Sequence, residues 1–134
     1  MNNQKIKQRI VIFTIIILIA LIHILRVGSY LSGHLYRLYY SYFSDIVIPF
    51  GFYYLLCSAA LDIQQLNSWK LKLLISFLLP SLAETLQFFK IPILGSTFDP
   101  LDYLMFGFGS ALAVVMETQL FPRIFLFWKN EAKN

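Results

Sequence analysis

Four long apolar runs, separated by short polar segments, constrain this chain more than any other feature. They cover residues Ile10–Leu25, Ile46–Leu61, Leu71–Phe89 and Leu101–Phe121. A helix of roughly 20 apolar residues crosses the hydrocarbon core of a bilayer. The last two runs reach that length, and neighbouring residues complete the first two. We therefore predict an all-α membrane bundle, one domain over residues 1–134, with spans at about residues 10–27, 43–61, 71–89 and 101–121.

Composition supports lipid as the main surrounding of this chain. Hydrophobic residues make up 58% of the sequence and charged residues only 13%, whereas soluble domains carry about 25% charged residues. The first run follows a basic start, as a signal peptide would. However, it continues His23-Ile24-Leu25-Arg26 without a small-residue cleavage site, which favours an uncleaved span.

The net charge is +4, and the basic residues are distributed as expected for the orientation of a membrane protein rather than for a nucleic-acid-binding surface. Basic residues lie in short clusters between the apolar runs, and cytoplasmic segments carry the excess of Lys and Arg. With four spans, the side of the termini holds eight of them and the opposite side three. The eight are Lys5, Lys7, Arg9, Lys70, Lys72, Arg123, Lys129 and Lys133; the three are Arg26, Arg37 and Lys90. We predict a multi-pass cell-membrane protein with both termini in the cytoplasm and no nucleic-acid partner.

The first external connection, residues 28–45, is rich in tyrosine. Leu31, Leu35, Leu38 and Tyr42 recur in it at helical spacing. This pattern predicts a short helix lying in the membrane interface, with tyrosine rings at headgroup depth. A loop that carries an aromatic belt is the alternative.

Acidic residues collect at the predicted external ends of three spans. Asp99 followed by Pro100 is typical of a helix start, because aspartate caps free amides and proline has none to lose. Asp102 shares a helical stripe with Gly109, so we expect it to face the bundle. Glu84 lies too deep in its span to act as a cap, and an acid at bilayer depth must be protonated, paired or hydrated.

These positions form one candidate ligand-binding site at the external face. It comprises Asp45, Glu84, Gln87, Asp99 and Asp102, with Arg37 available nearby. The alternative is structural: caps and interhelical hydrogen bonds worth roughly 0.6–2 kcal/mol each. The chain lacks the familiar catalytic signatures, so an enzyme is not favoured. No cofactor is expected, and nothing in the pattern requires a metal.

The spacing Glu84-x-x-Gln87, then a short loop and Asp99-x-x-Asp102 with Gly109, resembles the second half of the VanZ-like family of small membrane proteins. Asp45 followed by Pro49-x-Gly51 resembles that family's first-half motif. The resemblance covers roughly residues 45–113. It implies a polytopic protein of the bacterial envelope; founding members of the family are associated with resistance to glycopeptide antibiotics.

Three functions fit the pattern. The first is an envelope protein whose acidic site binds a lipid-linked or cell-wall component. The second is a small transporter or ion-coupling protein, which would need to form a homo-oligomer to enclose a path and lacks a visible inverted repeat. The third is an accessory subunit that binds a partner helix through the aromatic external segment and a face made of Gly107, Gly109 and Ala113.

Overall fold

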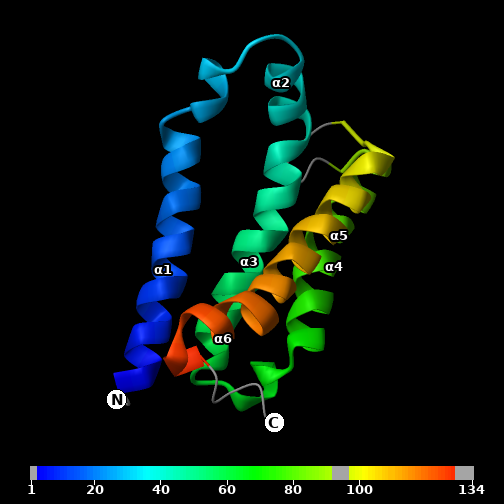
Figure 1. Cartoon of the computed structure of the whole chain (residues 1–134). Coiled ribbons are helices and arrows are strands. Elements are labelled where there is room, and N and C mark those ends of the chain that lie inside the picture. Colours follow the sequence, from blue (N-terminus) through cyan, green and yellow to red (C-terminus); the bar gives the residue numbers. More distant parts are fainter. Residues whose placement is uncertain (1–2, 92–96, 129–134) are drawn as a thin grey trace.

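The computed structural model describes residues 3–91 and 97–128, and in them the chain forms a bundle of long helices joined by short connections (Figure 1). The α-helices are α1 (Asn3–Ile24), α2 (Gly33–Leu38), α3 (Ser44–Ala60), α4 (Trp69–Phe88), α5 (Pro100–Val115) and α6 (Phe121–Ile124). Short 3₁₀ turns cover Val27–Tyr30, Gln64–Asn67 and Leu126–Trp128, and π-helical turns cover Tyr39–Phe43 and Met116–Leu120.

The predicted fold class is confirmed. Four helical segments are long and apolar enough to cross a membrane: Asn3–Ile24, Gly33–Ala60, Trp69–Phe88 and Pro100–Ile124. Large apolar side chains such as Phe13, Leu78 and Leu104 are exposed on the outside of the bundle. In a soluble protein such a surface would be costly, whereas in a bilayer it contacts lipid tails. The chain is therefore a multi-pass membrane protein.

The segment predicted as an interfacial helix is helical, and it continues directly into the second span. α2 passes through the π-helical turn Tyr39–Phe43 into α3, giving a single helical segment of 28 residues. In Figure 1, α2 stands on top of α3 and extends beyond the start of α5. Stacking of Tyr39 on Phe43, with ring centroids 4.4 Å apart, spans the π-helical turn.

Close packing of α3 against α5 forms the centre of the bundle. A Cβ atom added to Gly109 would lie 2.0 Å from the carbonyl oxygen of Ile46, so only glycine allows the two backbones to approach this closely. Ala113 is fully buried one turn further along, where the Tyr54 hydroxyl donates to its carbonyl oxygen at 3.3 Å. Both small residues are thus buried inside the bundle, so these two members of the predicted partner-binding face are not available to a partner helix.

The two ends of the bundle differ in character. We call the end that holds Asn3 and Trp128 the terminal end; there the Gln4 side chain donates to the Phe127 carbonyl oxygen at 2.7 Å. We call the opposite end, where α3 and α5 begin and α4 ends, the acidic end (Figure 1). Lys129 and Lys133, which contribute to the predicted orientation, lie outside the described residues.

Candidate functional site at the acidic end

Asp99 starts α5 in the way the sequence predicts. Its side chain accepts a hydrogen bond from the backbone N–H of Leu101 at 2.9 Å, and Pro100 follows it at the first helical position. The cap satisfies one of the amides that a helix start leaves unpaired. Asp99 therefore has a complete structural role.

Glu84 binds the same helix start from a neighbouring helix. Its carboxylate accepts the backbone N–H of Asp99 at 2.7 Å, and the residue is only 4% exposed. In a capping box, an acid at the third helical position would take this N–H. That position in α5 belongs to Asp102. Glu84 was expected to lie too deep to act as a cap; it does not cap its own helix, but it does complete the cap of α5.

Because Glu84 already accepts the Asp99 N–H, the Asp102 carboxyl group is not needed there and is directed toward α3. The side chains of Asp45 and Asp102 lie within hydrogen-bonding reach of each other, with Glu84 and Asp99 nearby. A hydrogen bond between two carboxyl groups requires that one of them carries a proton. Asp45 and Asp102 are half-buried, unlike Glu84. The structure therefore assembles four acids from three helices.

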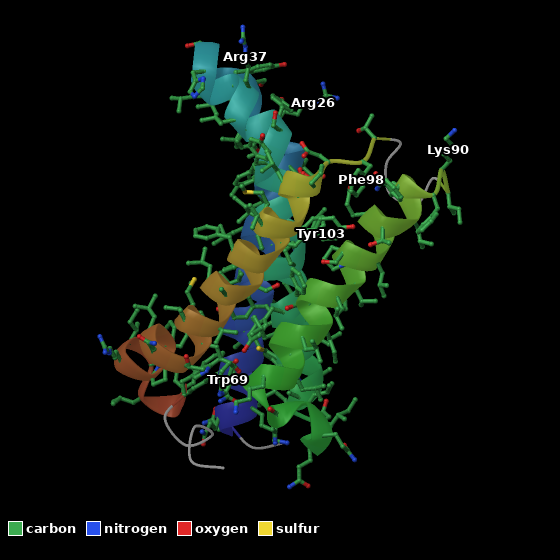
Figure 2. The ribbon with its side chains drawn as sticks, turned by 90° about the vertical axis from the view of Figure 1, so that its right-hand side faces the viewer. Arg26, Arg37, Trp69, Lys90, Phe98 and Tyr103 are labelled. Atoms are coloured by element: carbon green, nitrogen blue, oxygen red, sulfur yellow. The ribbon has the colours of Figure 1, made fainter. Side chains whose placement is uncertain are left out.

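The remaining two predicted site residues differ in position. Gln87 lies on α4 one turn beyond Glu84 and is half-buried. Arg37 is exposed on α2, and Figure 2 shows it far beyond the start of α5, where Tyr103 lies. Arg37 therefore does not join the acidic cluster. The cluster consists of oxygen acceptors, half-buried at Asp45, Asp99 and Asp102 and buried at Glu84, so it suits a group that donates hydrogen bonds or carries positive charge.

Metal binding is not evident in this arrangement. Within residues 3–91 and 97–128, no three His, Cys, Asp or Glu side chains are grouped as potential ligands of a metal ion. The Thr85 and Tyr103 hydroxyls, 2.8 Å apart, form a further link between α4 and α5 below the acids. This link holds the two helices whose ends carry Glu84 and Asp102.

A second polar cluster, at the terminal end, was not predicted. Lys72 of α4 forms an ion pair with Glu117, and the Tyr53 hydroxyl donates to the same carboxylate. The Lys72 side chain is 3% exposed and that of Glu117 14%. Lys72 Nζ also lies 5.4 Å from the centroid of the Tyr53 ring. The Cys57 thiol lies within hydrogen-bonding reach of the ion pair.

A signal for this pair was present in the sequence. Lys72 and Glu117 each interrupt an apolar run, and antiparallel neighbouring spans bring both positions to the same end of the bundle. Opposite charges at equal depth in adjacent spans pair with each other. Glu117 also lies in the π-helical turn Met116–Leu120, a type of turn that is frequent at functional sites.

Comparison with protein-family models, with curated proteins and with solved structures finds no match.

Proposed function

We propose that this chain is a VanZ-like protein of the bacterial cell membrane that binds a lipid-linked or cell-wall component at its acidic end. The observation that carries the proposal is the close approach of the Asp45 and Asp102 side chains, which come from different helices. Asp99 and Glu84 are occupied by the cap of α5. Asp45 and Asp102 cap no helix, and two acids side by side repel each other when both are charged.

The chemistry of the cluster favours a ligand that donates hydrogen bonds. Two half-buried carboxyl groups placed side by side offer several lone pairs to a donor and can carry negative charge. Amine and hydroxyl groups of an envelope precursor match both properties. Binding energy comes from replacing the repulsion among like charges with charge-assisted hydrogen bonds. Lipid surrounds the bundle, so a lipid-linked component reaches this end without leaving the membrane.

Orientation is a second part of the proposal. Eight of the eleven basic residues fall on the side of the termini, and that side is cytoplasmic under the positive-inside rule. The acidic end then faces the exterior, where wall precursors are assembled. A reporter active only outside the cytoplasm, fused after Asn134, should be inactive, whereas the same reporter inserted after Ser32, before α2, should be active. The reverse pattern would overturn the external location of the site.

Binding itself is tested with amide variants. Asp45→Asn and Asp102→Asn keep the size of the side chains and can still hydrogen-bond to each other, so the bundle should lose about 1 kcal/mol or less. The double variant removes both ionisable groups. Asp62→Asn is the matched control, because Asp62 follows α3 at the terminal end and pairs with Arg9.

The measurement is mass spectrometry of molecules that copurify with gently solubilised protein. The wild type and the Asp62→Asn control should carry the same envelope component, and the Asp45→Asn/Asp102→Asn double variant should lose it. If the double variant retains that component at the wild-type level, the acids only support the fold. The accessory-subunit function would then be favoured.

A further inference from the structure

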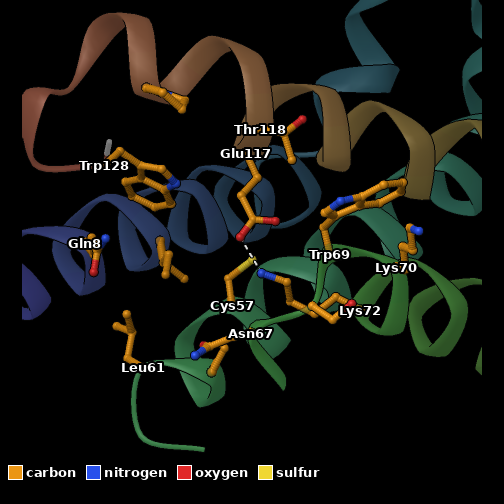
Figure 3. A pocket seen from close by; sticks show the side chains of 14 residues that line it. Gln8, Cys57, Leu61, Asn67, Trp69, Lys70, Lys72, Glu117, Thr118 and Trp128 are labelled. Atoms are coloured by element: carbon orange, nitrogen blue, oxygen red, sulfur yellow. Dashed lines mark hydrogen bonds and ion pairs between the residues drawn. The ribbon is translucent and has the colours of Figure 1, made fainter. Parts of the chain in front are cut away.

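A polar cavity of about 550 Å³ lies at the terminal end, away from the acidic cluster. Gln8 and Ile12 of α1, Cys57 of α3, Lys72 of α4 and Glu117 line it, together with two tryptophans. Its volume falls within the range of small-molecule sites, about 300–1,000 Å³. Figure 3 shows Gln8 and Trp128 on one side of the cavity, Trp69 and Lys70 on the other, and Glu117 between them.

Gln8 provides the observation that points to a ligand. It is 1% exposed, and within the described part of the chain its Oε1 atom has no hydrogen-bond partner. A buried polar atom without a partner destabilises the fold, since it loses its hydrogen bonds to water and gains none. A leucine would fill the same space without this cost. Gln8 Oε1 is therefore an acceptor available to a hydrogen-bond donor in the cavity.

The charges around the cavity select a neutral donor. Lys72 and Glu117 neutralise each other. An anion would meet two acceptors, Gln8 Oε1 and the Glu117 carboxylate, and could not donate to them. A cation would meet Lys72 and, at the exposed side, Lys70. A hydroxyl group can donate to both acceptors and is repelled by neither charge.

The aromatic residues add a preference for a flat, partly apolar partner. The Trp128 side chain is 7% exposed, while Trp69 is 43% exposed at the opposite side. An indole ring packs against C–H groups and keeps its N–H available for an oxygen. We propose that the cavity binds a neutral polyhydroxylated ring, the chemistry of a sugar, whose hydroxyls donate to Gln8 Oε1 and Glu117 while its C–H faces pack on the tryptophans. The ring could belong to a glycolipid headgroup or to a free sugar.

Intrinsic fluorescence reports on this site directly, because both tryptophans of the chain line the cavity. The purified protein is placed in phosphatidylcholine nanodiscs and titrated with monoglucosyl diacylglycerol, with diacylglycerol, with phosphatidic acid, or with free glucose. A saturable change with the glucosyl lipid but not with glucose identifies a lipid headgroup. A saturable change with glucose identifies a free sugar. Either result supports the proposal, provided that diacylglycerol gives no change.

Gln8→Leu is the diagnostic variant. It removes the unpaired acceptor, so binding should weaken about tenfold, the loss of one hydrogen bond, while thermal stability is kept. Gln64→Leu makes the same replacement at an exposed position outside the cavity and should bind like the wild type. The proposal is wrong if the wild type responds to neither sugar probe, if phosphatidic acid gives the stronger response, or if Gln8→Leu binds the sugar as tightly as the wild type.

Discussion

Gly109→Ala tests the packing of α3 on α5, on which the placement of both polar clusters depends. The added carbon would lie 2.0 Å from the Ile46 carbonyl oxygen and 3.0 Å from Pro49 Cγ, whereas ordinary contacts begin at 3.4 Å. Because the obstacle is backbone, the helices must separate by more than about 1 Å at this point. Overpacking of this kind costs about 1–3 kcal/mol, and the backbone contact places Gly109→Ala toward the upper value.

Gly107→Ala is the matched control, two residues away in the same helix. Its added carbon would meet only the Phe77 ring, at an ordinary 3.8 Å. Alanine also favours a helix over glycine by about 1 kcal/mol, so this variant should be as stable as the wild type or more stable. The assay is thermal unfolding in detergent, followed by a thiol-reactive dye, because Cys57 is the chain's single cysteine and is buried. Equal unfolding temperatures for the two variants would refute the close approach at Gly109.

Two further predictions concern the ion pairs. Lys72→Met leaves the Glu117 carboxylate buried without its partner and should lower the unfolding free energy by about 3–5 kcal/mol. Adding Glu117→Gln should restore much of that stability in the same thermal assay. No restoration would contradict the pairing. Arg9→Ala breaks the pair with Asp62, whose side chain is 65% exposed. It should change the unfolding free energy by less than about 1 kcal/mol, and a larger loss would show that this pair is more shielded than its exposure indicates.

The number and order of the four spans could be read from the sequence, because a helix needs about 20 apolar residues to cross the bilayer. The start of α5 could be read as well, but the ends of α1 and α2 could not. α1 begins at Asn3, well before the apolar run, because Lys5 donates to the Leu61 carbonyl oxygen and Arg9 pairs with Asp62. α2 joins α3 because the tyrosine-rich segment contains no helix breaker after Gly33. Hydropathy describes lipid contact, whereas these ends depend on contacts made by polar side chains.

For the site, helix geometry predicted the roles of single residues, whereas the contacts between helices were predicted only in part. Asp99 as a cap and Asp102 facing the bundle follow from helix geometry alone. The hydrogen bond from the Asp99 N–H to Glu84 depends on how α4 packs against α5, and no local sequence pattern predicts that packing. Arg37 was grouped with the acids only because it lies on the same predicted side of the membrane. The continuous helix instead carries it away from them.

The central claim is that Asp45 and Asp102 meet at the acidic end, and cross-linking in native membranes tests it most directly. In a Cys57→Ala background, Asp45→Cys/Asp102→Cys is treated with a short bifunctional thiol reagent, digested and analysed by mass spectrometry. The control pair is Asp45→Cys/Asp62→Cys, which places its cysteines at opposite ends of α3. We predict a linked peptide joining positions 45 and 102 and none joining 45 and 62. Failure to link positions 45 and 102, when a monofunctional maleimide labels each cysteine alone, would contradict the claim.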